Sequence, residues 1–305
     1  MIAKRLGAIE AGGTKFLCAV GTPDGELLQE TRIPTGTPEE TIPQVIDFFQ
    51  DFSRDFSRSG GEPLAAIGIA SFGPVQIDRN SPQYGFITTT PKAAWRHFDL
   101  LGAIRRAFPV PAGFDTDVNG AALAEARWGA AKGLRAFLYV TVGTGIGGGA
   151  LVDGSPLHGM THGEMGHIRI PHDRSRDSFA GICPFHGDCL EGLASGPAIE
   201  ARWQVPATAL APDHAAWRLE AEYLALACVN WICVLSPQRI VLGGGVMRPE
   251  LFPLIRRRVC ELLNGYLDVP ELTRDIDRYI VPSPLEGRAG LLGALELSAR
   301  ALNQA

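Results

Sequence analysis

The sequence lacks an excess of positive charge. Its 28 lysines and arginines are outnumbered by 33 aspartates and glutamates, which gives a formal net charge of -5 and a pI near 5.8. No block of like charges stands out along the chain. Because proteins that bind a nucleic-acid backbone cluster lysine and arginine on one face, this composition argues against nucleic acid as a partner.

Long apolar segments are lacking as well. The longest, 223–235, is shorter than the roughly 20 residues that a membrane-spanning helix needs, and it contains Asn230. The first six residues lead directly into a strand-like segment, with no charged leader followed by an apolar stretch. We therefore expect a cytoplasmic protein with no membrane partner, in which 223–235 is a buried helix.

Cysteine is scarce, and disulfides are not expected in a reducing compartment. Four of the six cysteines stand among apolar neighbours, which predicts small buried thiols. These four are Cys18, Cys228, Cys233 and Cys260. Cys183 and Cys189 instead stand in a histidine-rich stretch, which makes them candidate metal ligands.

Two familiar nucleotide-binding motifs are missing. No Gly-x4-Gly-Lys-Ser/Thr run occurs, which excludes a P-loop. The spacing Gly143-x-Gly145-x-x-Gly148 matches a dinucleotide fingerprint, but that motif requires a helix after it. Here 150–152 looks like the second arm of a hairpin that an Asp-Gly turn closes, so a nicotinamide cofactor is not expected.

What the chain does contain is one pattern used twice. A strand, a glycine-rich turn and a second strand occur at 6–20 and again at 137–152. Each hairpin is followed, after helical sequence, by an apolar strand that runs into glycine, at 66–70 and at 240–242. Helices are expected at 37–49, 119–131, 217–235 and 286–302.

This alternation of strands and helices predicts an α/β fold of two related lobes, with a ligand in the cleft between them. We expect a smaller N-terminal lobe at 1–115 and a larger lobe at 116–286. The C-terminal helix, at about 287–305, is expected to pack back on the first lobe.

The glycine-rich turns are candidate phosphate sites. Successive backbone N–H groups without side chains form an anion-binding concavity. The turn at 11–15 adds a threonine and a lysine, and the turn at 143–149 adds a threonine. A single turn of this kind could merely close a hairpin, whereas two in matching positions favour binding of one triphosphate.

Together these segments resemble the sugar kinases and repressors that share one motif set, the ROK family. The resemblance covers nearly the whole chain, with phosphate loops at 11–15 and 143–149 and an adenosine-side turn at 243–247. It implies a two-lobed actin-like (ribonuclease-H-like) ATPase fold with a central cleft, and ATP as phosphoryl donor. The implied ATP contacts are Gly12, Gly13, Thr14, Lys15, Thr144, Gly145, Pro197, Gly243, Gly244 and Gly245.

Four further segments, 71–75, 84–88, 90–92 and 183–189, are similar to the fructokinase branch of that family. This similarity implies phosphorylation of D-fructose to D-fructose 6-phosphate by a homodimer. A manno- or glucokinase of the same fold remains an alternative. So does a sugar-sensing repressor, which would carry an N-terminal helix-turn-helix domain, or an actin-like ATPase that needs no sugar.

A sugar kinase needs a carboxylate to accept the proton of the attacking hydroxyl. Asp117 lies between a strand-like segment that ends at Phe114 and a helix that starts near Asn119, and the resemblance places the catalytic base there. On residue type alone, Asp115, Asp117 or Asn119 could cap the helix instead. We expect Asn119 to cap while Asp117 acts as the base.

Histidine is concentrated in one segment, because five of the seven histidines lie within 158–186. The same segment contains the pattern Cys183-x-x-His186-x-x-Cys189, and two thiolates with an imidazole suit tetrahedral zinc. His167 and His172 are the candidates for the fourth ligand, and similarity to the family motif favours His167. With four protein ligands the zinc would be structural.

The resemblance also implies sugar-hydroxyl contacts from Glu164, His167 and Glu191. A zinc-bound imidazole keeps its second nitrogen free to donate a hydrogen bond, and carboxylates accept strongly from hydroxyls. Mg²⁺ is expected on the nucleotide phosphates. The family commonly has aspartate where this chain has Glu10, so no protein ligand of Mg²⁺ is assigned.

Overall fold

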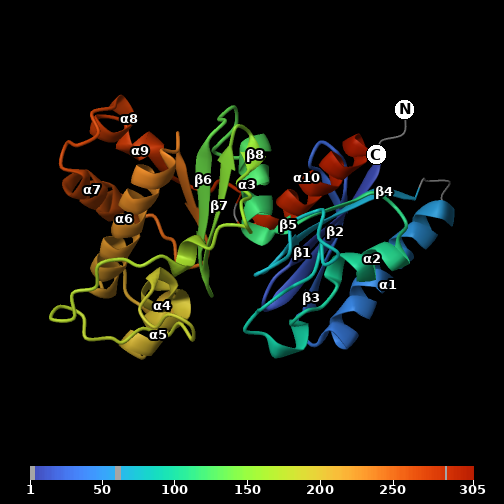
Figure 1. Ribbon diagram of the computed structural model, residues 1–305, viewed down its shortest axis with the longest axis horizontal. Helices are drawn as coiled ribbons and strands as arrows, with labels where there is room; N and C mark the ends of the chain where they lie inside the picture. The colour runs from blue at the N-terminus through green and yellow to red at the C-terminus, as the bar shows by residue number, and fades with distance from the viewer. Residues whose placement is uncertain (1–3, 59–62, 286) are drawn as a thin grey trace. The chain divides into compact units, whose positions relative to one another are not determined.

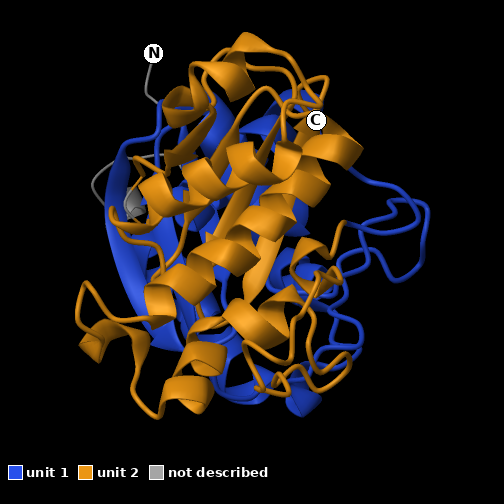
Figure 2. Ribbon diagram, turned by 90° about the vertical axis from the view of Figure 1, so that its left-hand side faces the viewer, with its two compact units in different colours: residues 1–128, 156–162, 288–305 blue, residues 129–155, 163–287 orange. Residues whose placement is uncertain are grey.

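The computed structural model describes residues 4–58, 63–285 and 287–305 (Figure 1). The chain divides into two compact units (Figure 2). Unit 1 comprises residues 1–128, 156–162 and 288–305, and unit 2 comprises 129–155 and 163–287. The expected lobe boundary after residue 115 falls one residue before the end of β5 (Ala112–Thr116), and β5 and the following α3 (Asp117–Arg127) both belong to unit 1.

Unit 1 is built on a five-stranded mixed sheet with the order β3-β2-β1-β4-β5. β2 runs antiparallel to β1 and β3, whereas β4 is parallel to both β1 and β5. The strands are β1 (Arg5–Ala11), β2 (Lys15–Gly21), β3 (Leu27–Pro34), β4 (Leu64–Ser71) and β5 (Ala112–Thr116).

Helices cover both faces of this sheet. Successive strand residues point to opposite faces, so Ile67 packs in the core with Phe49 of α1 while Gly68 faces α10. A Cβ on Gly68 would stand 1.9 Å from the carbonyl oxygen of Ala294, so glycine lets α10 approach the sheet closely. The helices of unit 1 are α1 (Pro38–Arg58), α2 (Leu100–Ala107), α3 (Asp117–Arg127) and α10 (Ala289–Gln304), with the 3-10 turn η1 (Ala93–Trp95).

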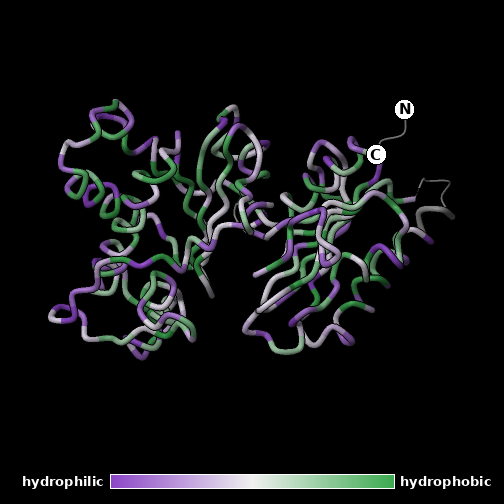
Figure 3. Tube along the Cα trace, in the orientation of Figure 1, coloured by the Kyte–Doolittle hydropathy of each residue, from purple (hydrophilic) through white to green (hydrophobic). Residues whose placement is uncertain are grey.

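Unit 2 repeats this sheet. Its strand order is β10-β9-β6-β7-β8, in which β7 is antiparallel to β6 while β9 is parallel to both β6 and β10. Hydrophobic residues run through the strands of both units (Figure 3), and the duplicated pattern predicted from the sequence is confirmed. The strands are β6 (Phe137–Val142), β7 (Ile146–Val152), β8 (Ser155–Pro156), β9 (Ile240–Gly243) and β10 (Ile280–Pro282).

The second glycine-rich turn is shorter than expected. β7 begins at Ile146 and Val142 pairs with Ile146, so only 143–145 form the turn. The remaining glycines lie in β7. Met165 packs against one of them, since a Cβ on Gly148 would stand 2.8 Å from Sδ of Met165. The predicted Asp-Gly turn is present, since Asp153 and Gly154 both have positive φ between β7 and β8.

The helices of unit 2 surround α6 (Ala216–Leu235), which packs on α7 and α4. The predicted buried helix is therefore confirmed in part: Leu224 and Cys228 are buried, but Cys233 and Val234 near its C-terminus are exposed. The prediction of a buried thiol at Cys233 was wrong because the apolar stretch continues past the buried face of the helix. The other helices are α4 (Leu190–Ala194), α5 (Gly196–Trp203), α7 (Leu251–Leu263), α8 (Pro270–Thr273) and α9 (Ile276–Tyr279), with the 3-10 turns η2 (Met165–His167) and η3 (Ala207–Ala209).

Within the residues that the structure describes, no helix combines the length and the hydropathy that a membrane crossing would require.

Candidate functional site

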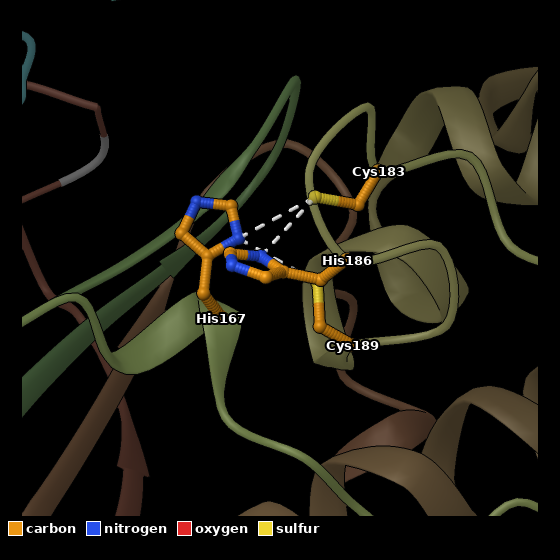
Figure 4. A group of neighbouring side chains, drawn as sticks. All are labelled: His167, Cys183, His186 and Cys189. Carbon is orange, nitrogen blue, oxygen red and sulfur yellow. Dashed lines mark hydrogen bonds between the residues drawn. The ribbon is translucent and has the colours of Figure 1, made fainter. Parts of the chain in front are cut away.

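Four side chains of unit 2 form a group that could hold a metal ion (Figure 4): His167, Cys183, His186 and Cys189. Their ligand atoms all lie within 4.8 Å of one another. Sγ of Cys183 is 3.7 Å from Nδ1 of His167 and 3.6 Å from Nδ1 of His186, and Sγ of Cys189 is 3.5 Å from Nδ1 of His167. Zinc bonds of about 2.3 Å to sulfur and about 2.0 Å to nitrogen, at a tetrahedral angle, would separate these atoms by about 3.6 Å. The donor set and its spacing therefore fit zinc.

The backbone around this group is shaped by a tight loop. Cys183 and Gly187 exchange two backbone hydrogen bonds of 3.1 and 2.9 Å, and Gly187 has a φ of 63°. The loop returns directly to Cys189, which is buried and precedes α4. His167 comes from the 3-10 turn η2. The metal group therefore joins two segments of unit 2 that no strand separates along the described part of the chain.

His172, the alternative fourth ligand, lies outside the group. Its side chain is 5% exposed, its Nε2 is 2.9 Å from the carbonyl oxygen of Asp177, and its Nδ1 is 3.2 Å from Oδ2 of Asp188. Hydrogen bonding to His172 holds the pKa of the Asp188 carboxyl below its usual range. His172 thus contacts the metal-binding loop through Asp188, the residue that precedes Cys189.

Glu191 stands between the metal group and the second glycine turn. Its Oε2 accepts a hydrogen bond of 2.8 Å from the backbone N–H of Ile146, and its Oε1 lies 3.9 Å from Nε2 of His167. Glu164 is exposed and directly precedes η2, where its carbonyl oxygen accepts from the N–H of His167. The predicted sugar contacts Glu164, His167 and Glu191 therefore occur on adjoining parts of unit 2.

The predicted ATP contacts of unit 2 come from three turns that adjoin one another. A Cβ on Gly143 would lie 3.8 Å from the backbone nitrogen of Gly245, which brings the β6–β7 turn beside the turn after β9. The N–H of Gly196 donates to the carbonyl oxygen of Gly143 at 2.8 Å, so the start of α5, with Pro197, joins them. Thr144, Gly145 and 243–245 thus lie close to Pro197.

The predicted ATP contacts of unit 1 lie in the turn between β1 and β2. The N–H of Gly12 donates to the carbonyl oxygen of Lys15 at 3.0 Å, and Thr35 binds this turn through its hydroxyl, which donates to the carbonyl oxygen of Gly12 at 2.8 Å. A Cβ on Gly13 would meet Cε of Lys92 at 3.2 Å. Lys92 is therefore a further candidate contact beside this turn; residue type did not predict it, although it lies in one of the branch-specific segments.

Asp117 is the first residue of α3 and directly follows β5. The expectation that Asn119 caps this helix was wrong: the side chain of Thr116 accepts from the N–H of Asn119, and Nδ2 of Asn119 donates to Asp115 at 2.7 Å. Burial raises the pKa of Asp117 to about 6, against an opposing hydrogen bond from the N–H of Val118. A carboxylate with this pKa is suited to act as a base near neutral pH.

Glu10 on β1 is electrostatically coupled to Asp117. Burial raises the pKa of Glu10 to about 7, the charge of Asp117 adds to this, and Lys15 opposes it. The carboxyl group lies against the start of α10, where a Cβ on Gly290 would be 2.4 Å from it. Its buried Oε2 has no hydrogen-bond partner among the described residues.

Two of the clustered histidines lie outside the metal group and contact residues of unit 1. The segment 156–162 belongs to unit 1, where Nε2 of His158 lies 2.9 Å from Oδ2 of Asp115 and Nε2 of His162 accepts from the N–H of Val75 at 3.0 Å. The bond with Asp115 raises the pKa of His158. Histidine type and spacing do not reveal these roles, because the partners are 43 and 87 positions away.

The paired sheets and their glycine turns define a protein of the actin-like ATPase class. The chain belongs to the ROK family, whose model matches residues 6–301. It is 45% identical over 305 residues to a fructokinase of Zymomonas mobilis subsp. mobilis, covering 99% of this chain and 98% of that one. A fructokinase of Pediococcus pentosaceus is 43% identical over 301 residues, with coverage of 98% and 99%. The crystal structure of a ROK hexokinase from Thermus thermophilus matches 99% of this chain and 100% of its own with a TM-score of 0.74 at 26% identity.

Proposed function

We propose that this protein is a fructokinase that transfers the γ-phosphoryl group of ATP to the 6-hydroxyl of D-fructose. The observation that carries the substrate is the similarity, over nearly the whole chain, to proteins named fructokinase. The general reaction, ATP-dependent phosphorylation of a hexose, also agrees with the ROK family fold and with the carboxylate at the start of α3.

Asp117 is the proposed general base. The sugar hydroxyl must lose its proton as it attacks the γ-phosphorus, and a half-buried carboxylate with a pKa of about 6 is ionised at neutral pH yet basic enough to accept that proton. Asp117 lies in the first turn of α3, where the Thr116 cap fixes the backbone. The carboxylate therefore needs little reorganisation during the reaction.

The proposed phosphate contacts are backbone N–H groups and two lysines. The turn at 12–15 and the turn at 143–145 offer N–H groups without bulky side chains, and Lys15 and Lys92 add positive charge beside the first turn. Gly243, Gly244 and Gly245 with Pro197 would contact the nucleoside side. Mg²⁺ would accompany the phosphates, and the unpartnered Oε2 of Glu10 suits a contact to its hydration shell.

The four residues His167, Cys183, His186 and Cys189 would hold zinc, which supplies a rigid link between η2 and the loop before α4. With Nδ1 of His167 directed at this group, its Nε2 is left to donate to a sugar hydroxyl beside Glu191. Glu164 and Glu191 would accept from other hydroxyls of the sugar.

A manno- or glucokinase differs from this proposal only in the sugar that these contacts select. The proposed partners are the sugar and the nucleotide, with no nucleic acid or membrane, and we propose a cytoplasmic homodimer. The proposed base belongs to unit 1, and the proposed sugar contacts belong to unit 2.

The test is ATP turnover measured with fructose, mannose, glucose and no sugar. We expect fructose to give the largest kcat/KM and the product to be the 6-phosphate. Higher kcat/KM on glucose or mannose would reject the substrate assignment, and ADP release at one rate with or without sugar would reject the kinase itself.

A further inference from the structure

Ile146, the first residue after the second phosphate turn, is held through both of its backbone polar groups. Its N–H donates to Oε2 of Glu191 at 2.8 Å. A Cβ on Gly166 would lie 1.7 Å from its carbonyl oxygen, so η2 packs directly against the next peptide unit. The residue that follows the turn is therefore fixed by a proposed sugar contact and by the segment that carries the candidate metal ligand His167.

The same carboxylate explains why the turn has glycine at position 145. A Cβ there would stand 2.7 Å from Oε2 of Glu191, and the atoms of Glu191 are the only ones that it would meet within 4 Å among the described residues. The φ of Gly145 lies outside the left-handed range, so its backbone conformation does not demand glycine. The carboxylate of Glu191 is therefore the group that a side chain at position 145 would displace.

The backbone that carries Glu191 is tied to the turn a second time. The carbonyl oxygen of Glu191 accepts from the N–H of Ser195 at 3.1 Å, and the next residue, Gly196, donates its N–H to the carbonyl oxygen of Gly143 at 2.8 Å. The segment from the end of the metal-binding loop to α5 thus contacts the hairpin at Gly143, where the turn begins, and at Ile146, directly after the turn.

Glu191 is also open on its other side. Its side chain is 27% exposed, and its Oε1 faces Nε2 of His167 at 3.9 Å, a gap too long for a direct hydrogen bond. One oxygen is therefore committed to the phosphate turn while the other remains available to a ligand hydroxyl. When one ligand displaces a carboxylate that is shared in this way, the site of the other ligand changes as well.

We propose that Glu191 is the positioning residue of the second phosphate turn as well as a sugar contact, so that one carboxylate couples sugar affinity and nucleotide affinity. This inference rests on the proposed function, because it takes the turn as the phosphate site. Coupling of this kind is reciprocal: bound sugar changes the nucleotide affinity by the same factor as bound nucleotide changes the sugar affinity. Because one carboxylate serves both sites, we also expect a change at Gly145 to alter sugar binding and a change at Glu191 to alter nucleotide binding.

The experiment measures, by calorimetry, the Kd of ADP without sugar and the Kd of fructose without nucleotide. For Glu191→Ala we expect ADP to bind about tenfold more weakly, since a partly buried hydrogen bond to a charged acceptor is lost. Glu191→Gln, whose amide oxygen can still accept from Ile146, should keep ADP binding within about threefold while fructose binding falls. Glu200→Ala, an exposed carboxylate on α5, serves as the control and should change neither Kd.

Gly145→Ala tests the coupling in the other direction. Its methyl group displaces the Glu191 carboxylate, so fructose should bind more weakly even without nucleotide. In the double variant Gly145→Ala with Glu191→Ala the obstructing oxygen is gone, so ADP should bind no more weakly than to Glu191→Ala alone.

Wild-type ADP affinity in Glu191→Ala, or wild-type fructose affinity in Gly145→Ala, would overturn the coupling. Gly145→Ala and Glu191→Gln keep these outcomes measurable if Glu191→Ala does not fold. Failure of the wild-type protein to bind ADP or to phosphorylate fructose would instead reject the proposed function, which separates the two conclusions.

Discussion

Gly293 of α10 lies directly against Gly120 of α3, where a Cβ on Gly293 would be 2.1 Å from the carbonyl carbon of Gly120. The same helix lies over Gly68 of β4. Glycines from three elements thus let α10, which is more than 160 positions from α3 in the chain, pack at backbone contact. Since α3 begins with Asp117, this packing also holds the helix that carries the proposed base.

Gly293→Ala should destabilise unit 1. Alanine would favour an isolated helix by about 1 kcal/mol, but the methyl group would have to push α10 away from the α3 backbone, so we expect a net loss of about 1–3 kcal/mol in unfolding free energy. Urea denaturation measures this change. Asn303→Ala, an exposed substitution on the same helix, should have little effect. Equal stability of the two variants would contradict the packing described above.

Asp117→Asn should abolish most turnover without harming the fold. Loss of a general base typically costs 10²–10⁴-fold in rate, while asparagine keeps the size of the side chain. Because burial of the charged carboxylate costs stability, the variant should be as stable as the wild type or more stable by about 1 kcal/mol at pH 7. Fructose turnover and thermal unfolding of the same sample check both parts. A variant with near-normal kcat would exclude Asp117 as the base.

The pH dependence of the reaction should follow the same carboxylate. Its folded-state pKa of about 6 lies above its ordinary value of 3.8, so the base is lost as the pH falls through about 6. We expect log kcat/KM to fall with unit slope below that pH. The effect of this carboxyl group on stability has the opposite pH dependence. Asp117 favours folding below pH 3.8 and costs stability above about pH 6. An activity plateau that extends unchanged to pH 4.5 would contradict the assignment.

Features set by local sequence could be predicted, and features set by distant partners could not. The repeated hairpins and the pattern Cys183-x-x-His186-x-x-Cys189 are local, so the two sheets and three of the four candidate metal ligands were recognisable from residue type and spacing. Thr116 instead of Asn119 caps α3 because Asn119 is drawn to Asp115, a choice between neighbours that residue type does not decide.

The features that were not predicted depend on tertiary contacts. Lys92 becomes a candidate only because its side chain lies beside Gly13, which is almost 80 positions earlier in the chain. Glu191 was expected as a sugar contact, but its bond to Ile146 requires α4 to be packed beside β7. Similarity to the family pointed to Glu191 as a sugar contact but could not indicate this hydrogen bond.

Removal of the proposed zinc should lower stability more than loss of an ordinary thiol. Cys189→Ser or treatment with a strong chelator should eliminate bound zinc and lower the melting temperature, because the loop at 183–189 would lose its link to His167. Cys233→Ser removes an exposed thiol on α6 and is the matched control, with zinc content and melting temperature unchanged. Metal analysis together with calorimetry checks both. One equivalent of zinc in Cys189→Ser would show that the ligand set is wrong.

The segment 156–162 should depend on His162 for its attachment within unit 1. The imidazole is 5% exposed and accepts the N–H of Val75, so His162→Ala would leave a buried backbone donor without this acceptor, at a cost of about 1–3 kcal/mol. His162→Gln can place an amide oxygen near the position of Nε2 and should recover part of that loss. Hydrogen exchange at the Val75 amide separates this local effect from general destabilisation, because exchange should accelerate in the alanine variant and slow again in the glutamine variant. Unchanged protection of Val75 in both variants would mean that the segment is held by its other contacts.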